Sequence, residues 1–168
     1  MWQTIRRERS GAPRRIRRTA EGLEKMVGIK LTAEEMRYIT FFEKLTDARL
    51  HDCVISDDGR SIIFVVKKGD MGIAIGKNGS KIKKVQRAIG KSVQVIEHTD
   101  DLNEFLNNFL SPVKILEVNL VEQDGKRIAK ITVEKHEKGM AIGARGRRIQ
   151  GLKKLAERYF GLVDVVIA

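Results

Sequence analysis

The sequence contains one short motif twice, and this repeat limits the fold more than any other feature. The segment IAIGKNGSKI at residues 73–82 aligns without a gap with MAIGARGRRI at residues 140–149, 67 positions later. Both segments, with the residue before each, contain the spacing Gly-x-x-x-Gly-x-x-Gly. Self-similarity at a fixed distance indicates that one structural unit occurs two times along the chain.

The sequence around each motif predicts the same order of elements. An Asp-Gly pair between two apolar runs indicates a β-hairpin before each motif, at Asp58-Gly59 and at Asp124-Gly125. A helical stretch and a final apolar strand follow each motif, with the strands at residues 92–97 and 163–168. We therefore expect each copy to fold as helix, strand, strand, short helix, Gly-x-x-Gly turn, helix and strand.

Each copy also begins with a pair of residues that is typical of a capped helix start. The pairs are Thr32 with Glu35, and Asp101 with Glu104. In such a capping box, a side-chain oxygen and a carboxylate satisfy the free amides of the first helical turn. Both copies should therefore open with a helix that the sequence itself caps.

The chain divides into three parts. Residues 1–25 carry eight basic and three acidic residues without sustained apolar periodicity, which predicts a disordered basic arm. Alternatively, translation begins at Met26 and this segment is absent from the native protein. The two copies of the repeat form predicted domains at residues 26–97 and 98–168. Because a unit of about 70 residues has a marginal core alone, we expect the two units to pack together.

Positive charge is concentrated around the two motifs. The chain has 33 Lys and Arg residues against 22 Asp and Glu residues, a net charge of +11. Residues 67–91 contain eight basic residues and one acidic residue, and residues 135–158 contain eight basic and two acidic residues. Since an ordinary solvated surface mixes the two signs, this segregation predicts an anion-binding track along both copies.

Each Gly-x-x-Gly turn is suited to hold a phosphate group. A turn between two helices leaves the first N–H groups of the second helix unpaired, and the helix dipole adds partial positive charge there. Gly76 and Gly79 lack a Cβ atom and would let a phosphodiester backbone approach closely, while Lys77 adds a mobile charge. Alternatively, the glycines only form a tight corner between two helices. The recurrence of the turn within dense basic charge favours the anion site.

The helices after the turns have one apolar and one basic face. In the first copy, the apolar stripe consists of Ile82, Val85 and Ile89, and the opposite face carries Lys83, Lys84 and Arg87. In the second copy, Arg147, Lys154 and Arg158 lie opposite the apolar stripe formed by Ile149, Leu152, Ala156 and Tyr159. We expect the stripes to be core and the basic faces to be free to meet a ligand.

These features resemble the K-homology (KH) domain. The segments IGKNG at residues 75–79 and IGARG at residues 142–146, each between two predicted helices, resemble the GXXG motif of type II KH domains. The resemblance implies an α+β fold of two tandem domains, each a three-stranded mixed sheet with helices on one face. A KH domain holds the backbone of about four unpaired nucleotides on this loop. The bases would lie in an apolar groove, for which Ile75, Ile82 and Val95 are candidates, although Ile82 also fits the core.

The tandem layout and the segment IKLTAEEMRYITFFEKLT at residues 29–46 resemble archaeal NusA-like transcription termination and antitermination proteins. We do not expect the polymerase-binding and OB-type domains that precede the KH pair in bacterial NusA. The resemblance therefore leaves open whether this protein contacts RNA polymerase directly. The implied ligand is single-stranded RNA, either a nascent transcript or ribosomal RNA. A ribosome-associated or ribosome-assembly protein is the alternative function, and single-stranded DNA is an alternative ligand.

The predicted RNA-binding residues are the two loops and the basic residues that follow them. They are Gly76, Lys77, Asn78, Gly79, Lys81, Lys84, Arg87, Gly143, Ala144, Arg145, Gly146, Arg147, Arg148 and Lys154.

The sequence does not predict an enzyme. A P-loop needs four residues between its glycines and a Ser or Thr after its lysine. The segment Gly72-x-x-x-Gly76-Lys77 has three residues there and is followed by Asn78. No residues are predicted to act in catalysis, bind a metal or hold a cofactor. The single cysteine, Cys53, favours a cytoplasmic protein. No stretch approaches the roughly 18 apolar residues of a membrane span, so we expect no membrane partner. We also expect a monomer.

Overall fold

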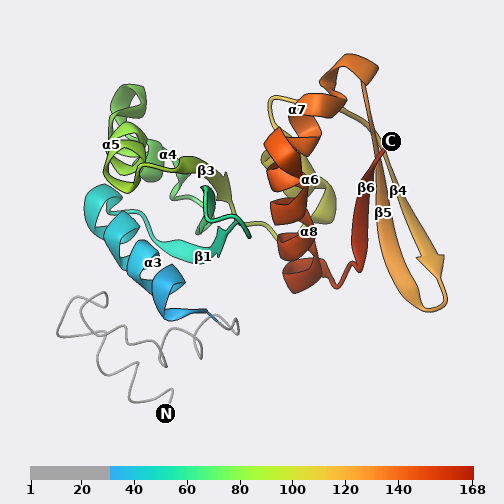
Figure 1. Cartoon of the computed structure of the whole chain (residues 1–168), viewed down its shortest axis with the longest axis horizontal. Helices are drawn as coiled ribbons and strands as arrows, with labels where there is room; N and C mark the ends of the chain where they lie inside the picture. The colour runs from blue at the N-terminus through green and yellow to red at the C-terminus, as the bar shows by residue number, and fades with distance from the viewer. Residues whose placement is uncertain (1–30) are drawn as a thin grey trace, which may run out of the picture.

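The computed structural model describes residues 31–168, so the predicted basic arm at residues 1–25 lies outside the described residues. The elements of the first unit are α3 (Ala33–Thr46), β1 (Leu50–Ile55), β2 (Ser61–Val66), α4 (Met71–Ile75), α5 (Ser80–Ile89) and β3 (Ser92–Glu97). Those of the second unit are α6 (Leu102–Leu110), β4 (Ile115–Gln123), β5 (Lys126–Val133), α7 (Lys138–Ile142), α8 (Arg147–Phe160) and β6 (Asp164–Ile167). Both units have the predicted order of elements (Figure 1).

Each unit contains a three-stranded mixed sheet. In the first sheet, β2 pairs antiparallel with β1 and parallel with β3, and the second sheet repeats this pattern in the order β4-β5-β6. Helices α3 and α5 pack on one face of the first sheet, where Phe42, Phe64 and Val85 are fully buried in one cluster. The predicted α+β fold of two KH-like units is therefore confirmed.

The two predicted helix starts differ. Thr32 and Glu35 form the full capping box, because the N–H of Glu35 donates to Thr32 Oγ1 at 3.1 Å and the N–H of Thr32 donates to Glu35 Oε1 at 2.9 Å. The Asp101 carboxylate accepts from the N–H of Glu104 at 2.9 Å. The Glu104 carboxylate does not reach back, because it accepts from the Thr99 hydroxyl at 3.1 Å. The second helix start is therefore half of a capping box.

The second unit covers the outer face of the first sheet. Helices α6 and α8 lie between the first unit and the second sheet (Figure 1). One buried cluster joins apolar residues of the first sheet to apolar residues of these two helices: Val54, Ile63, Val65 and Ile96 with Phe105, Phe109, Leu152 and Leu155. Helix α8 approaches closely at Gly151, where an added Cβ would collide with Cδ1 of Ile63. The two units therefore share a core, as expected, and the linker that joins them is short, residues 98–101.

Within residues 31–168, only the first sheet is buried on both faces, and the sequences of the two central strands explain why. Strand β2 is a continuous apolar run after its first residue, and those five residues are buried. Strand β5 alternates instead, with Ala129, Ile131 and Val133 buried and Lys130 exposed between them. A strand that is buried on both faces is typically a continuous apolar run, whereas one open face gives alternation.

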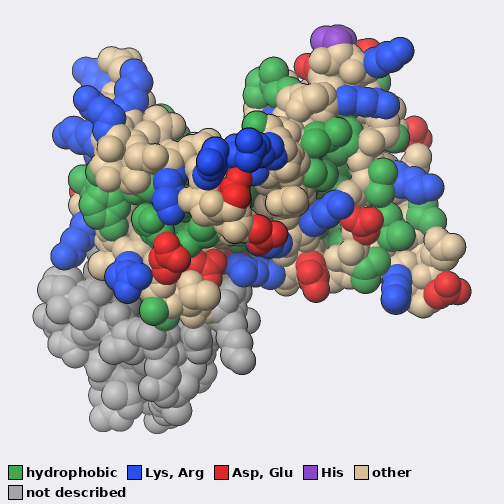
Figure 2. Space-filling view, in the orientation of Figure 1, with side chains coloured by type: hydrophobic (Ala, Val, Ile, Leu, Met, Phe, Trp, Pro, Cys, Tyr) green, Lys and Arg blue, Asp and Glu red, His purple; other side chains and the backbone are tan. Residues whose placement is uncertain are grey.

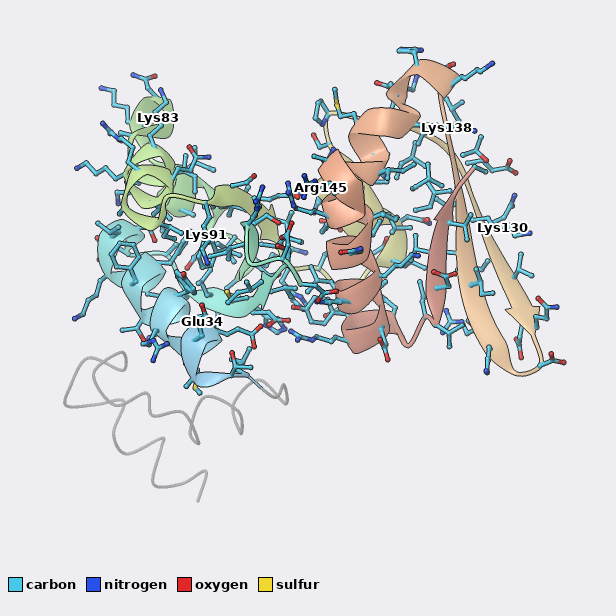
Figure 3. All side chains as sticks on the ribbon, in the orientation of Figure 1. Glu34, Lys83, Lys91, Lys130, Lys138 and Arg145 are labelled. Carbon is cyan, nitrogen blue, oxygen red and sulfur yellow. The ribbon has the colours of Figure 1, made fainter. Side chains whose placement is uncertain are left out.

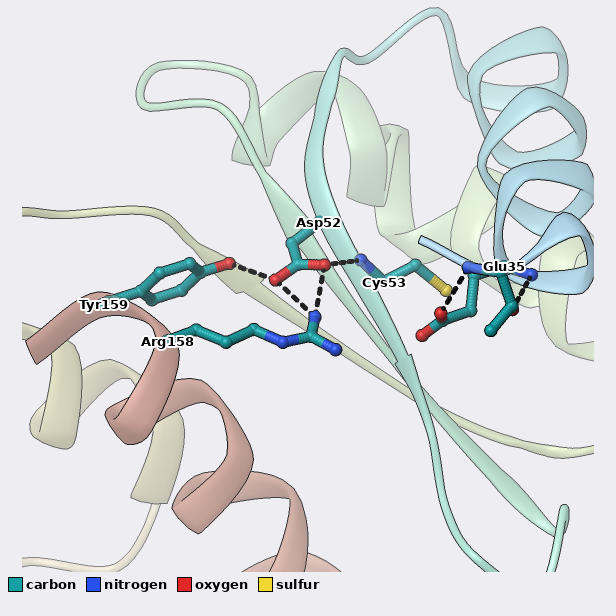
Figure 4. Close-up of polar contacts among 6 residues, drawn as sticks. Glu35, Asp52, Cys53, Arg158 and Tyr159 are labelled. Atoms are coloured by element: carbon teal, nitrogen blue, oxygen red, sulfur yellow. Dashed lines mark hydrogen bonds and ion pairs between the residues drawn. The ribbon is translucent and has the colours of Figure 1, made fainter. Parts of the chain in front are cut away.

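A buried carboxylate lies at the joint between the units (Figure 4). Asp52 of β1 is fully buried and accepts from Nη1 of Arg158 at 2.8 and 2.9 Å, and from the hydroxyl of Tyr159 at 2.7 Å. Burial raises the pKa of the Tyr159 phenol, and the nearby Asp52 charge raises it further, so the phenol remains a donor. Removing one partner of a buried charge typically costs about 3–5 kcal/mol, so this cluster fastens α8 to the first sheet.

Candidate nucleic-acid interface

The two GXXG loops have the same backbone conformation. Gly76 and Gly143 have φ/ψ of 76/172° and 80/169°, and Asn78 and Arg145 are left-handed with φ of 56° and 55°. Each first glycine is required for space as well as conformation. At Gly76, an added Cβ would lie 2.7 Å from Cγ of Lys81. The left-handed position suits an asparagine better than an arginine. The backbone conformation of Arg145 is therefore less favourable than that of Asn78.

Both loops end at a helix that no side chain caps. Gly79 and Gly146 are the N-cap residues of α5 and α8, and neither helix start receives a side-chain hydrogen bond. In contrast, Thr32 and Asp101 cap α3 and α6 with their side chains. The first N–H of each helix is nevertheless paired, since Ser80 donates to the carbonyl of Lys77 and Arg147 donates to that of Ala144. This corrects the expectation that the first amides are unpaired, although no side chain caps either helix start. An uncapped start with its partial positive charge suits a phosphate oxygen.

Two of the predicted RNA-binding cations brace the loops from within the protein. Nζ of Lys81 donates to the carbonyl of Thr46, at the end of α3, at 2.9 Å. Its counterpart Arg148 donates to the carbonyls of Met140, Phe109 and Ser111 at 3.1, 2.9 and 2.8 Å. Burial lowers the pKa of the Arg148 guanidinium. In both units, this side chain ties the loop to the end of the first helix.

A second group of predicted residues is exposed. In the loops these are Lys77, Asn78, Ala144 and Arg145, and on the outer face of α5 they are Lys84 and Arg87. Figure 2 shows Lys and Arg side chains gathered on the upper part of the first unit and again between the two units. Lys83 of α5 and Arg145 of the second loop lie on this same upper side (Figure 3). This side of the molecule therefore presents cations from both units.

The basic face of α8 is not free, which corrects the sequence-based expectation for this helix. Arg147 Nε contacts Asp58 Oδ2 at 2.5 Å, and Lys154 Nζ contacts Asp57 Oδ1 at 2.7 Å. Hydrogen bonds from Ser56, Arg147 and the N–H of Arg60 hold the pKa of Asp58 well below its usual range. The acidic turn of the first hairpin therefore lies against the face of α8 that we expected to meet a ligand.

Several apolar residues lie near the loops. The groove candidates Ile75, Ile82 and Val95 are half-buried, and Ile82 and Val95 pack against the core of the first unit. Two more exposed side chains were not among the predicted site residues: Ile73 on α4, 45% exposed, and Met140 on α7, 54% exposed. They occupy equivalent positions of the repeat, three residues before the first glycine of each loop. The sequence already showed an apolar residue at both equivalent positions, but the repeat alone does not say that these side chains are exposed.

Within residues 31–168, no group of three His, Cys, Asp or Glu residues is arranged to hold a metal ion. The helices in that range include none long and apolar enough to cross a membrane.

Comparison with known proteins places the chain in a family. A model of the KH domain matches residues 36–122, and a model of the NusA-like second KH domain matches residues 102–165. The chain belongs to the NusA-like KH proteins. The NusA-like chain is 37% identical over 137 residues to a "Probable transcription termination protein NusA" of Halobacterium salinarum, covering 82% of this chain and 96% of that protein.

Two further relatives agree with this NusA-like assignment. A protein of the same name from Methanocaldococcus jannaschii is 32% identical, over 84% of this chain and 76% of that protein. The crystal structure of APE1850 superposes with a TM-score of 0.69 at 34% sequence identity, over 82% of this chain and 100% of that one. Sequence and fold therefore place the whole tandem, and not one unit alone, in the family.

Proposed function

We propose that this NusA-like protein binds single-stranded RNA through its two GXXG loops and acts in transcription termination or antitermination. The observation that carries this proposal is the pair of helix starts without a side-chain cap and with matching loop backbones, both within basic sequence. The relatives that cover nearly all of the described chain are named as transcription termination proteins. The role is one of binding, with no catalytic step.

The mechanism rests on the backbone of the RNA strand. One phosphate would lie at the start of α5 and another at the start of α8, each attracted by the partial positive charge of a helix N-terminus that no side chain caps. Lys77 and Arg145 would add charge at the tips of the two loops, where both are exposed. The exposed Ile73 and Met140 beside the loops offer apolar surface to the unpaired bases. Because these contacts need splayed bases, a duplex would bind poorly.

Charge reversal in the first loop tests the phosphate contact. The double substitution Lys77→Asp with Asn78→Asp should keep the fold, because Asp also tolerates the left-handed backbone of residue 78. RNA affinity should fall by about tenfold or more, since the charge at a phosphate site is reversed. Gln123→Asp with Lys126→Asp makes the same change of charge at the β4–β5 hairpin and serves as the control. Equal losses in both variants would contradict a phosphate site at the loop.

The length of the ligand tests whether both loops hold one strand. Each KH unit holds about four nucleotides, so a strand of about eight should be the shortest one bound tightly. Fluorescence anisotropy with a series of labelled oligonucleotides at fixed salt would measure this. A limit of about four nucleotides would mean that only one loop binds RNA.

The cellular role can be tested separately from RNA binding. If the protein acts in termination, it should co-purify with elongating RNA polymerase. Co-purification with precursors of the small ribosomal subunit instead would favour a role in ribosome assembly.

A further inference from the structure

A cleft of about 200 Å³ lies between the second loop and the first sheet. One wall comes from the second unit, with Gly143 and Ala144 of the loop and the side chains of Arg147 and Arg148. The other wall comes from the ends of β2 and β3, and includes Ser61, Ile62, Ile63, Ser92 and Gln94. The cleft therefore exists only because the two units pack together. It lies on the side of the second loop that faces the first unit.

We propose that this cleft holds one nucleobase of the RNA strand and reads its identity. This inference rests on the proposed function, because the strand must be bound at the second loop. A phosphate at the start of α8 would place the sugar of the same nucleotide beside Gly143 and Ala144, which line the cleft. The base attached to that sugar, or to its neighbour, then has the cleft as the nearest enclosed surface.

The size of the cleft fits one base. Pockets for drug-sized ligands measure about 300–1,000 Å³, so a cleft of about 200 Å³ suits a single ring system and no more. Gly143 and Ala144 of the loop line it, so a base on a strand held at this loop would lie next to the cleft. A free small molecule would have few enclosing walls there.

The two arginines of the cleft are held in place by the protein. Arg147 is fixed by Asp58, and Arg148 by three backbone carbonyls. The Asp58 carboxylate compensates the charge of Arg147, and the carbonyls occupy N–H groups at the edge of Arg148. A base would therefore contact the planar face of a guanidinium. Bases of single-stranded RNA stack on such faces. Because the side chains are already ordered, stacking costs little additional side-chain entropy.

The opposite wall supplies hydrogen-bonding groups. Gln94 Nε2 donates to the carbonyl of Phe109 at 2.8 Å, which fixes the amide and leaves Oε1 as an oriented acceptor. Ser61 and Ser92 are paired neighbours on β2 and β3, and their hydroxyls can donate or accept. A wall of fixed polar groups discriminates between bases, since an unmatched base leaves those groups unpaired.

In the same geometry, a facing wall for the first loop would have to come from a sheet before the first unit, and residues 31–168 contain only the two sheets of the two units. The selective contact should therefore affect one nucleotide position only, at the second loop. The first unit would hold its part of the strand with less discrimination.

Abasic scanning of the RNA tests the proposal. The ligand is a labelled RNA of about ten nucleotides, long enough for two tracts of roughly four, in which each base in turn is replaced by an abasic ribose. In the wild-type protein, one position near the second loop should lose about tenfold in affinity, within the range for stacking of one base.

The substitution Ser92→Leu fills the cleft without touching either loop. In this variant, the loss at that one abasic position should disappear, while the losses at other positions remain. Thr132→Leu, also on a strand but outside the lining of the cleft, should keep the wild-type profile. Thermal melting of both variants checks that they are folded.

The outcomes separate this proposal from the function itself. If the wild-type protein does not bind the RNA, the proposed function fails. If it binds and Ser92→Leu gives the same abasic profile as wild type, the cleft does not hold a base and this inference is overturned. Stacking can be checked independently, because 2-aminopurine at the sensitive position should change its fluorescence in wild type and not in Ser92→Leu.

Discussion

One basic residue after each loop, Lys81 in the first unit and Arg148 in the second, ties the loop to the rest of its unit. Arg148 donates to three carbonyls, and its counterpart Lys81 donates to one. Replacing Arg148 by Met leaves those carbonyls without their charged donor, so we expect a loss of about 2 kcal/mol in the free energy of unfolding. Arg145→Met changes an exposed tip and should shift stability by less than about 0.5 kcal/mol, while weakening RNA binding.

Urea denaturation of the two variants, followed by RNA titration of each folded protein, measures both effects. Equal stability of Arg148→Met and Arg145→Met would show that Arg148 is not a brace.

Tyr159 links the stability of the joint to alkaline pH. Its pKa is raised in the folded protein, whereas an unfolded tyrosine ionises near pH 10. The unfolded state therefore releases its proton first, so the stability that Tyr159 contributes is complete below pH 10 and decreases as the pH rises above it.

Urea denaturation between pH 8 and about pH 11 should show this decrease in wild type. Tyr159→Phe should be less stable at neutral pH and decrease less steeply. Tyr38→Phe, as the control for loss of a phenol, should keep the wild-type slope.

The arrangement of elements within each unit was predictable from the sequence. Asp-Gly turns, apolar strands and the repeated GXXG motif each act over a few residues, and all were confirmed as secondary structure. The contacts between the two units were not predictable in the same way. Helical periodicity separates the basic face of α8 from its apolar stripe, but it does not say what that face meets. The partners of Arg147 and Arg158 are Asp58 and Asp52, more than 80 positions away.

One signal of the interface was present in the sequence. The run SIIFVV of β2 has no polar position for an open face, whereas β5 alternates. Read as two-sided burial, this run predicts that a second layer covers the first sheet. The alternation of β5 predicts in turn that one face of the second sheet is open.

Helices α5 and α8 occupy equivalent positions but should contribute unequally to RNA binding. Arg87 on α5 is exposed, while its counterpart Lys154 on α8 is paired with Asp57. If α5 contacts phosphate, Arg87→Gln should weaken binding of all sequences and reduce the slope of log affinity against log salt by about 1. Lys154→Gln is the matched control, and it should leave that slope unchanged. Titrations at four salt concentrations measure the slopes. A change of slope with Lys154→Gln alone would mean that α8, and not α5, contacts phosphate.

At the scale of the whole molecule, the joint between the units contains a pair of histidines. The rings of His51 on β1 and His98 in the linker stack with centroids 3.8 Å apart, and both are in T-shaped contact with the ring of Tyr159. His98 Nε2 lies 3.3 Å from Asp100 Oδ1, and its Nδ1 is buried without a hydrogen-bond partner in the described structure. The linker is thus packed into the joint. Protonation of a histidine there should change the stability of the folded tandem.

The histidine pair should make the folded tandem less stable at mildly acidic pH. Burial lowers the pKa of His51, the charges of His98 and Lys67 act in the same direction, and Asp52 and Asp100 oppose them. An unfolded histidine binds a proton near pH 6.5, so the unfolded state takes up the proton first. The stability that the neutral His51 contributes is therefore present above pH 6.5 and falls as the pH decreases through the lower folded pKa.

Urea denaturation from pH 7.5 to about pH 5.5 should show this loss in wild type and a smaller loss in His51→Gln. His136, exposed before α7, supplies the control, because His136→Gln should follow wild type. The same slope in all three proteins would mean that the joint does not respond to this proton.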